Sequence, residues 1–590
     1  MNNDRGVIVG KKLIFTGQIV PFRIQTLIKQ ENGEKEMSSG GGNIPVIVLK
    51  EGTGRTTGRE AQKNNIMAAK IVAEAVKSTL GPCGMDKMLV TSFGDVAITN
   101  DGATILKELD VQHPAAKMLV EVAKAQDNEV GDGTTTAVVL CGELLSKAEG
   151  LLDKNVHPIV IIEGFKKASD KALEVLETIA IPVCLSDDKT LRIVAVTSLS
   201  SKGISVAEDH FAKIIVEAVK QVAEEVDGKL TADIDLIKVV KKHGKSLDET
   251  ELVKGMVIDK EVASSQMPKY VENAKIALLN EKLEIEKTEF DAKINIESPE
   301  QMQLFLDEEE RMLKEMADAV SKAGANVLFC EKGIDDMTLH FLSKKGVMAI
   351  KSVSSSDMEK LARATGGKIL SSVKDLDADS LGKAKKVEEV KIGDDKLIYV
   401  RECKNPKAVT IVIRGAATHV IDEAERSLHD GLCVVRNAVE DGKIVAGGGA
   451  PEEEIAKNLR SYAAKVGGRE QLAVEAFAEA VEVIPLTLAE NAGLDPIDVM
   501  VALRAKHEDP ENKYFGIEVT TGKVKNMLDL LVLEPLRVKQ QVIKSATEAA
   551  NMILKIDDLI AVKGGGKMPP MPPGGMGGMG GMGMGGMPPY

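Results

Sequence analysis

The spacing of hydrophobic residues predicts that the first 180 residues or so are mainly helical. Over residues 61–80, apolar side chains recur every three or four positions, and Gly81-Pro82 ends that pattern. A short alternating run at 96–99 indicates a strand. Helical spacing then returns over 105–108, 114–126 and 137–152. Helices therefore dominate this part of the chain, with a single strand between them.

The pattern changes in the middle of the chain and then changes back. Between about residues 274 and 415, apolar runs at 276–279, 326–330, 396–400 and 408–413 alternate with helical patterns such as 334–344. Such alternation is typical of an α/β domain. Helical spacing returns over 451–560. We expect the two helical ends to pack into one discontinuous domain, with the α/β domain inserted between them.

One helix of the inserted part has a clear beginning. Ser298 suits the N-cap position, Pro299 the first turn and Gln301 the third position of a capping box. Two interpretations stay open: a helix with one buried face, or an exposed methionine- and phenylalanine-bearing surface that contacts another polypeptide. The apolar residues concerned are Met302, Phe305, Leu306, Leu313, Met316 and Val320.

Charge and hydropathy exclude several classes of partner. Among 590 residues, 90 are acidic and 76 are basic, so the formal net charge is −14, and no block of five basic residues occurs. Such a surface repels nucleic acid and anionic lipid. No run of about 18 apolar residues could span a membrane, and the N-terminus lacks the pattern of a signal peptide. We expect a cytoplasmic protein that binds neither nucleic acid nor membrane.

The positions of the glycines and cysteines predict a flexible tail and reduced thiols. Twelve of the 53 glycines lie in residues 564–590, a Gly/Met-rich segment that cannot form a core and is predicted to be a flexible tail. The six cysteines are scattered without any CxxC motif. This distribution favours reduced thiols over disulfides or a zinc site.

The strongest chemical signal is the loop 131–136, which reads GDGTTT and precedes a predicted helix. Glycines let backbone N–H groups approach an anion, and the N-terminus of the helix adds positive potential. Asp132 is a candidate Mg²⁺ ligand beside a bound nucleotide. A capped helix start after a tight turn explains the same residues, and both interpretations stay open on this motif alone.

Three further loops resemble the first one in permitting close approach to phosphate. They read TLGP at 79–82, NDG at 100–102 and GGG at 447–449. Asp101, Asp132 and Asp430 are candidate carboxylates for hydrolysis, although a single aspartate in a turn is more often a cap. The near-match to a dinucleotide motif at 52–58 lacks a following βαβ unit, and GxxxxGK[ST] is absent. A nicotinamide site and a P-loop are therefore disfavoured.

Taken together, the motifs resemble the group II chaperonins over about residues 59–563 and in the Gly/Met tail. The resemblance rests on these motifs in this order: TLGP at 79–82, GMDKM at 84–88, TNDG at 99–102, HPAAK at 113–117, GDGTTT at 131–136, VAGGG at 445–449 and EPLRVK at 534–539. Cys83 is a departure, since many relatives carry lysine there. Residues 1–36 have no counterpart in the family pattern and are expected to be an extension outside the fold.

The resemblance implies a multidomain α and α/β protein with three domains. A helical equatorial ATPase domain would comprise residues 37–187 and 447–563. A small intermediate domain would comprise 188–258 and 409–446. An α/β apical domain, which binds substrate, would comprise 259–408, with a helical lid protrusion near 284–323.

The resemblance also implies a role for individual residues. Asp132 would bind Mg²⁺, Asp101 and Asp430 would position the attacking water, and Lys202 would sense the γ-phosphate of ATP. The remaining nucleotide contacts would come from Leu80, Gly81, Pro82, Gly133, Thr134, Thr135, Thr136, Gly447, Gly448, Glu534 and Lys539.

The function implied is that of an ATP-dependent molecular chaperone. Identical or paralogous subunits would form a double ring, which would enclose non-native polypeptides under a built-in lid and couple ATP hydrolysis to lid closure and folding. A small-molecule kinase is the main alternative, but no convergent set of His, Asp and Arg residues marks an acceptor pocket. A scaffold without hydrolysis is disfavoured because all three candidate carboxylates are present.

Overall fold

The computed structural model describes residues 8–9, 12–13, 53–90, 94, 96–109, 111–200, 202, 207–285, 299–393, 395–404 and 406–562. Most of the predicted extension 1–36, the predicted N-cap Ser298 and the predicted tail 564–590 lie outside these residues. The chain divides into two compact units, which are residues 1–20 with 63–555, and residues 21–62 with 556–590.

The smaller unit contains an antiparallel strand pair from the two ends of the chain. β3 (Thr53–Thr57) pairs with β23 (Asp558–Val562). The Arg55 guanidinium donates to both carboxylate oxygens of Asp558, with a shortest distance of 2.7 Å. This exposed bidentate ion pair favours the register of β3 and β23 in which Arg55 and Asp558 lie close together.

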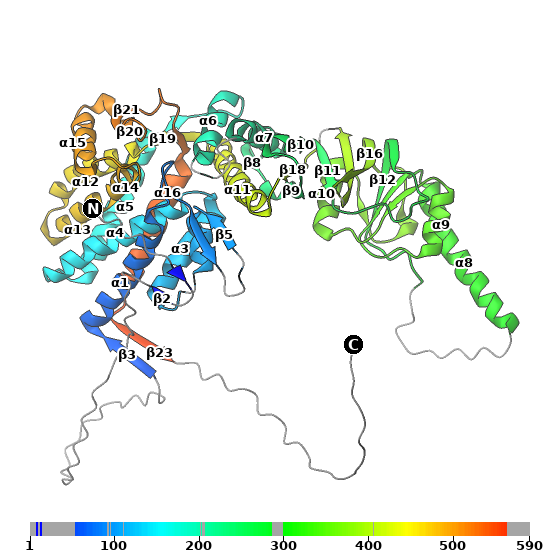
Figure 1. Cartoon of the computed structure of the whole chain (residues 1–590), viewed down its shortest axis with the longest axis horizontal. Helices are drawn as coiled ribbons and strands as arrows, with labels where there is room; N and C mark the ends of the chain where they lie inside the picture. The colour runs from blue at the N-terminus through cyan, green and yellow to red at the C-terminus, as the bar shows by residue number, and fades with distance from the viewer. Residues whose placement is uncertain are drawn as a thin grey trace, which may run out of the picture. The chain divides into compact units, whose positions relative to one another are not determined.

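The larger unit contains a helical core built from both halves of the chain. Helices α16 and α4 lie beside each other although they come from opposite ends of the sequence (Figure 1). The helices that contribute to this core are α1 (Gly58–Lys77), α2 (Gly102–Glu108), α3 (Pro114–Val130), α4 (Thr134–Asp153), α5 (Pro158–Ile179), α12 (Ala450–Val466), α13 (Gly468–Val481), α14 (Val483–Asn491) and α16 (Leu536–Leu554). The predicted association of the two helical ends is thus present.

A second hydrophobic core belongs to a seven-stranded mixed sheet, drawn in green in Figure 1. β12 pairs in parallel with β13 and β15 and antiparallel with β16, so the sheet changes direction at β12. Its elements are β11 (Gly255–Ile258), β12 (Tyr270–Leu279), β13 (Val327–Cys330), β14 (Met348–Ile350), β15 (Ile369–Leu370), β16 (Gly382–Ile392) and β17 (Asp395–Cys403), with α8 (Pro299–Lys322), α9 (Asp336–Lys344) and α10 (Ser355–Thr365). The alternating α/β pattern expected here is present.

A third hydrophobic core comes from residues on either side of that sheet in the sequence. Three long helices pack on a three-stranded sheet in the order β10-β18-β9. The elements are α6 (Asp188–Leu199), α7 (Glu208–Val222), β9 (Ile237–His243), β10 (Glu251–Val253), β18 (Val409–Gly415) and α11 (Thr418–Asp441). Helical and α/β parts therefore occur together in one chain.

The C-terminal part is less uniformly helical than the spacing predicts. Besides α15 (Pro496–His507), it contains β20 (Phe515–Glu518), which pairs with β21 (Lys523–Asn526). β22 (Leu533–Pro535) pairs with β19 (Lys443–Ala446), which also pairs with β6 (Ile181–Pro182). These strands are only two to four residues long, too short for a spacing of two to be recognised. The remaining short pairs are β1 (Ile8–Val9) with β2 (Lys12–Leu13), β4 (Lys87–Val90) with β5 (Val96–Thr99), and β7 (Ala223–Val226) with β8 (Lys229–Ala232).

Helix α8 combines the two interpretations that its sequence left open. Its C-terminal half buries Leu313, Ala317 and Val320, of which Ala317 and Val320 belong to the hydrophobic core of the sheet. Its N-terminal half exposes large apolar side chains, among them Phe305 at 48% and Leu304 at 68%. Among the described residues, no helix is long and apolar enough to cross a membrane.

A buried charge cluster joins α12, α14 and α15. Glu482 accepts hydrogen bonds from Arg460 and from Arg504, the latter at 2.6 and 2.8 Å. Glu453, only 1% exposed, lies beside Glu482 and 3.9 Å from Arg460. Burial, with the neighbouring negative charge of Glu482, raises the pKa of Glu453 to about 8. Glu453 is therefore largely protonated at neutral pH.

We expect Glu453→Gln to stabilise the protein at pH 9 and to have no effect near pH 5. Because the folded pKa lies above the unfolded value, the folded state retains a proton between pH 4.5 and about 8 that the unfolded state has lost. The contribution of Glu453 to the free energy of unfolding therefore falls as pH rises through that window. Glutamine does not titrate, so the variant lacks this dependence on pH. Urea unfolding, followed by circular dichroism at both pH values, measures the difference in free energy of unfolding between wild type and variant. Glu508→Gln, at an exposed position, is the control. Equal changes at pH 5 and pH 9 would contradict this assignment.

Candidate functional site

A cavity of about 520 Å³ lies in the larger unit and is lined by segments far apart in the sequence. Its walls come from the ends of α1 and α3, from α6 and α14, and from the segments around β20, β22 and α16. Of the site residues named from the sequence, it is lined by Leu80, Gly81, Pro82, Asp132, Gly133, Thr136, Gly448, Glu534 and Lys539. Three of the four predicted loops thus meet at one cavity.

The loop between α3 and α4 has the backbone of an anion-binding turn. Gly131 and Gly133 both adopt left-handed conformations, with φ of 70° and 74°. A Cβ atom at Gly133 would approach Val538 and Val542 to 3.1 Å, so space as well as conformation favours glycine. Gly133 caps α4 without a side-chain hydrogen bond. The first N–H groups of α4 are therefore available to an anion.

Helix α4 begins three residues earlier than its hydrophobic spacing predicts. It starts at Thr134, so Thr134, Thr135 and Thr136 form its first turn. Polar residues in a first turn give no apolar period, which explains the difference. Thr135 is buried, and Thr134 donates from Oγ1 to Asp101 Oδ1 at 3.0 Å. This bond links the loop at 100–102 to the cavity loop.

The Asp132 carboxylate is oriented at the cavity wall by two hydrogen bonds. Its Oδ1 accepts from the Gly133 N–H at 2.7 Å, and its Oδ2 accepts from Ser198 Oγ at 3.0 Å. The backbone carbonyl of Asp132 accepts from Gln126 Nε2 at 2.9 Å. A carboxylate oxygen has two acceptor sites, so each oxygen retains capacity to ligate a cation. Carboxylate oxygen is the kind of ligand that Mg²⁺ prefers.

The Asp101 carboxylate acts as a helix cap. Its oxygens accept from the N–H groups of Ala103 at 3.3 Å and Thr104 at 2.8 Å, at the start of α2. Together with the bond from Thr134, these contacts orient the carboxylate. The capping interpretation raised for a single aspartate therefore holds for Asp101, and the same contacts place it beside the first turn of α4.

Asp430, in the middle of α11, is buried in an ion pair. It accepts a hydrogen bond from Lys202, which follows α6, and their side chains are 12% and 8% exposed. Burial raises the pKa of Asp430 and outweighs the opposite effect of Lys202; Asp101 and Asp132 add negative charge nearby. Burial alone would favour neutral Lys202, but Asp430 and Asp132 hold its pKa above the usual range. The negative charges of the other two candidate carboxylates, Asp101 and Asp132, therefore act on both members of the pair.

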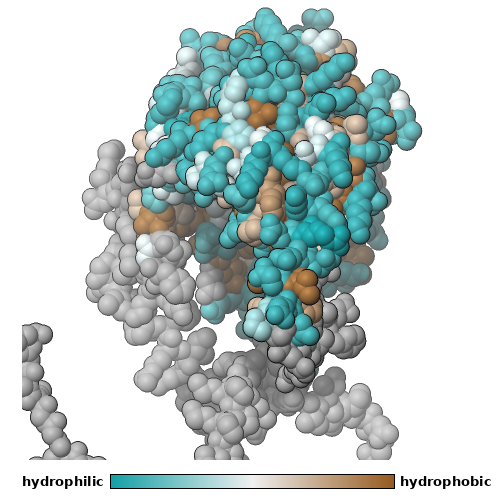
Figure 2. All heavy atoms as spheres, turned by 90° about the vertical axis from the view of Figure 1, so that its right-hand side faces the viewer, coloured by the Kyte–Doolittle hydropathy of each residue, from teal (hydrophilic) through white to brown (hydrophobic). Residues whose placement is uncertain are grey.

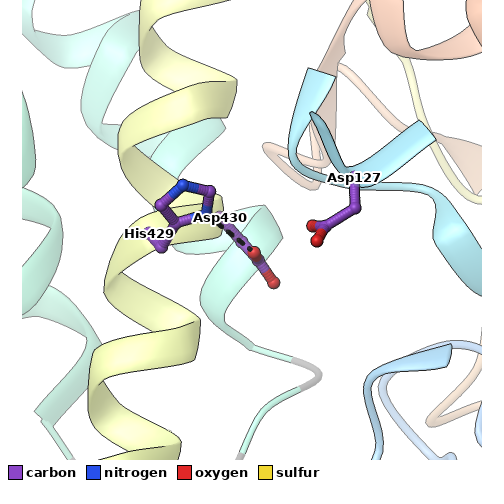
Figure 3. Close-up of side chains that lie close together, drawn as sticks. All are labelled: Asp127, His429 and Asp430. Carbon is purple, nitrogen blue, oxygen red and sulfur yellow. Dashed lines mark ion pairs between the residues drawn. The ribbon is translucent and has the colours of Figure 1, made fainter. Parts of the chain in front are cut away.

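Two residues that the sequence reasoning missed lie next to Asp430. Figure 3 shows Asp127 of α3 facing His429 and Asp430 of α11. Burial and the nearby Asp430 raise the pKa of Asp127 to about 6. Hydrogen bonds to Asp430 and Cys433 raise the pKa of His429 to about 10. Asp127 lies four residues before the start of the GDGTTT motif, and His429 directly precedes Asp430. Closeness in sequence to motif residues was the only signal.

At the wall of the cavity, Lys539 of α16 lies between two acidic residues. Its Nζ is 2.9 Å from Glu452 Oε1 and 2.8 Å from Glu534 Oε2. Burial opposes the charge of Lys539, but the two carboxylates overcome this effect and raise its pKa above the usual range. Burial, with Glu452 nearby, raises the pKa of Glu534 despite Lys539. The three groups form one buried charge cluster.

Glycines also shape the opposite wall of the cavity. Gly448 has φ of 65°, and a Cβ atom there would lie 2.6 Å from the Met527 sulfur. Its carbonyl accepts from the Ile517 N–H at 2.8 Å, while the Gly447 N–H donates to the Val532 carbonyl at 2.9 Å. These bonds join the 447–449 loop to the β20 and β22 segments. Other wall residues missed from the sequence are Thr197, Ser198, Ser200, Thr520, Leu530 and Val538.

The cysteines carry no disulfide, and their burial varies. Cys141, Cys330, Cys403 and Cys433 are buried, Cys83 is half-buried and Cys184 is exposed. The expectation of free thiols therefore agrees with the structure. Cys83 directly follows the cavity residue Pro82.

Comparison with known proteins gives one consistent result. Residues 72–564 match the model of the TCP-1/cpn60 chaperonin family. Similar proteins include the thermosome subunit beta of Archaeoglobus fulgidus, 59% identical over 520 residues, and a thermosome subunit of Methanopyrus kandleri, 60% identical over 518 residues; each alignment covers 88% of this chain and 95% of the relative. A thermosome subunit of Pyrococcus horikoshii is 56% identical over 532 residues, covering 88% and 97%. The chain therefore belongs to the TCP-1/cpn60 chaperonin family, as a group II chaperonin.

Proposed function

We propose that this chain is a subunit of an ATP-dependent double-ring chaperone, which encloses non-native polypeptides and couples ATP hydrolysis to lid closure. The observation that carries the proposal is the meeting of three glycine-containing loops at one cavity, where the carboxylate of Asp132 lines the wall. The buried pair Lys202–Asp430 adds the groups that hydrolysis requires. The partners would be identical or paralogous subunits and unfolded clients.

The cavity loops would hold the nucleotide. The N–H groups at the start of α4 and the hydroxyls of Thr134, Thr135 and Thr136 are suited to phosphate oxygens. Leu80, Gly81, Pro82, Gly447 and Gly448 would form the nearby walls, together with Glu534 and Lys539. Mg²⁺, held by Asp132, would supply neutralisation of the phosphate charge.

Hydrolysis would depend on Asp430, assisted by Asp101. A raised pKa makes the buried Asp430 carboxylate a better proton acceptor than a solvated aspartate. Lys202 Nζ neutralises it while no phosphate is present, and the arrival of the γ-phosphate would give Lys202 a second anionic partner. Lys202 would thus both sense the phosphate and release Asp430 to orient the attacking water.

A three-domain subunit is the domain layout we propose. The helical core draws on residues before about 187 and after 446, as an equatorial domain would. The core around α6, α7 and α11 corresponds to an intermediate domain at 188–258 and 409–446. The seven-stranded sheet, apart from its edge strand β11 at 255–258, would form an apical domain at 259–408. Asp430 would then belong to a different domain from Asp132, so that domain closure would control hydrolysis.

The exposed half of α8 would belong to the lid and contact other polypeptides. Met302, Leu304, Phe305, Leu306 and Met312 are each more than 40% exposed. On the face shown in Figure 2, most side chains are hydrophilic and hydrophobic side chains form small patches. Apolar residues on a surface that is otherwise hydrophilic favour contact with another polypeptide.

Three measurements on the purified full-length protein test this function. We expect double rings in electron micrographs, Mg²⁺-dependent release of phosphate from ATP, and reduced aggregation of a chemically denatured client when ATP is present. Chelation of Mg²⁺ by EDTA should abolish the phosphate release and the ATP-dependent part of the protection. A monomer that transfers phosphate to a small molecule would contradict the proposal and favour a kinase.

A further inference from the structure

Asp127, His429 and Asp430 form a mixed cluster of metal-ligating side chains outside the nucleotide-binding loop. One ligand atom from each lies within 4.8 Å of the others. Asp127 comes from the last turn of α3, whereas His429 and Asp430 are neighbours on α11. Figure 3 shows the Asp127 carboxylate directed across the gap toward these two side chains. The cluster thus spans two helices.

We propose that these three residues bind a borderline transition-metal ion such as Zn²⁺, at a site separate from the Mg²⁺ position at Asp132. Imidazole nitrogen and carboxylate oxygen are both ligands of Zn²⁺, and three protein ligands leave the fourth tetrahedral position to water. Ligand atoms around tetrahedral zinc lie roughly 3.3 Å apart, as follows from bond lengths of about 2.0–2.1 Å. The Nδ1 of His429 and Oδ1 of Asp430 are 3.7 Å apart, close to this spacing. The ligand atom of Asp127 lies within 4.8 Å of those of the other two and would move toward them on binding.

The charges around the cluster favour a cation. The carboxylates of Asp127, Asp430 and Asp101 lie near one another here, with His429 and Lys202 as the nearby positive groups, and His429 releases its proton when it ligates a metal ion. No lysine or arginine among the described residues forms an ion pair with Asp127. A divalent ion between the two carboxylates would replace their repulsion by attraction.

Lys202 does not compete for the metal-facing oxygen. It bonds to Oδ2 of Asp430, whereas His429 faces Oδ1. A ligating carboxylate commonly has its second oxygen held by an outer hydrogen bond, which fixes its orientation. Lys202 would have this positioning role while Asp430 ligates the metal through Oδ1.

Imidazole distinguishes this site from the site at Asp132. Nitrogen ligands favour zinc and similar ions, whereas Mg²⁺ prefers oxygen ligands. The cluster should therefore take up Zn²⁺ or Co²⁺ in the presence of millimolar Mg²⁺. Asp132, with oxygen donors around it, would remain the Mg²⁺ ligand.

Occupancy would have a regulatory effect on the hydrolysis proposed above. An ion bound to Asp430 Oδ1 occupies the carboxylate that would accept the proton of water, and it links α3 to α11. Zn²⁺ should therefore inhibit ATP hydrolysis without displacing the nucleotide. This effect rests on the proposed function, whereas metal binding itself does not.

Binding of the metal alone is the primary test. The full-length protein, without nucleotide and with excess Mg²⁺, is titrated with Zn²⁺ against a chromophoric chelator and with Co²⁺ while its visible d–d absorption is recorded. We expect one tight site per subunit. His429→Gln and Asp127→Asn should each weaken it by at least 10–100-fold, the range for disturbed metal shells.

Matched variants separate this site from adventitious ligands. His419→Gln removes an exposed imidazole from the same helix, and Cys184→Ser removes the exposed thiol; both should leave the tight site unchanged. Retention of wild-type binding by folded His429→Gln and Asp127→Asn would overturn the proposal. So would loss of binding in Cys184→Ser.

ATP hydrolysis at increasing Zn²⁺ then tests regulation. Inhibition of the wild type that is lost in His429→Gln supports the proposal. Equal inhibition of the wild type and His429→Gln would show that the inhibitory Zn²⁺ binds elsewhere. That result would overturn the proposed regulatory role of the cluster. If the protein binds one Zn²⁺ through this cluster but hydrolyses no ATP, the metal site stands and the proposed ATPase function fails.

Discussion

Asp430→Ala is expected to lower ATP turnover by roughly 10²–10⁴-fold, the usual contribution of a positioned acid or base, while nucleotide binding is retained. The carboxylate is buried, has a raised pKa and lies on α11, away from the phosphate-binding loop in the sequence. Its removal takes away a proton acceptor and leaves the N–H groups of the loop in place. Single-turnover phosphate release and equilibrium binding of a fluorescent ATP analogue measure the two effects separately.

Two companion variants make the result specific. Asp430→Asn keeps an oxygen that can accept from Lys202, so equal loss in the alanine and asparagine variants would identify the charge as the important property. Asp422→Ala changes an aspartate on the same helix whose partner, Lys241, lies 3.0 Å away and is also solvent-accessible; such surface pairs contribute little. Wild-type turnover in Asp430→Ala would refute the assigned role.

Lys539→Met is expected to destabilise the protein by about 3–5 kcal/mol, the usual effect of removing one partner from a buried ion pair. Methionine fills a similar volume but leaves Glu452 and Glu534 together without their cation. Glu452 Oε2 already lacks a hydrogen-bond partner among the described residues, so no described group compensates for the loss. Urea unfolding at pH 7.5, followed by circular dichroism, measures the change.

The same helix supplies the control for that variant. Lys544 is exposed, and no described residue forms an ion pair with it. Lys544→Met should therefore change the free energy of unfolding by no more than about 0.5 kcal/mol, as surface substitutions usually do. A similar change in both variants would show that charge in general, and not the buried cluster, determines the effect. Partial recovery of stability in Lys539→Met at low pH, where the glutamates take up protons, is expected for the same reason.

Local signals in the sequence were strong where one residue determines local structure. Pro114 marks the beginning of α3 because proline suits a first helical turn. The end was predicted too early, at 126: the helix continues to Val130 and stops at Gly131, which adopts a left-handed conformation. The strand Val96–Thr99 was predicted with its observed bounds. The predicted α8 helix begins at Pro299, its expected first-turn residue. Signals failed in short strands such as Leu533–Pro535, where long-range pairing, not local spacing, determines the structure.

The motifs that contribute to the site could be predicted from the sequence, but their arrangement in space could not. The loops at 79–82, 131–136 and 447–449 each indicated an approach to phosphate, yet nothing local showed that Leu530, Val538 and Ser198 complete the same cavity. Asp101 was predicted as a candidate carboxylate, but its two capping hydrogen bonds depend on backbone positions that form only with α2, and a third comes from the Thr134 hydroxyl of α4. Asp127 and His429 had no recognisable pattern, because their partners lie some 300 positions apart in the chain.

By itself, the sequence determined the family, the helical and α/β segments and three of the loops that line the cavity, because these depend on residue identity and short-range periodicity. Tertiary structure alone decided that Lys202 meets Asp430, that Asp127 faces His429, and that Lys539 lies between two glutamates. These contacts join distant segments, and their protonation depends on burial and on neighbouring charge. Both properties arise only when the chain is packed.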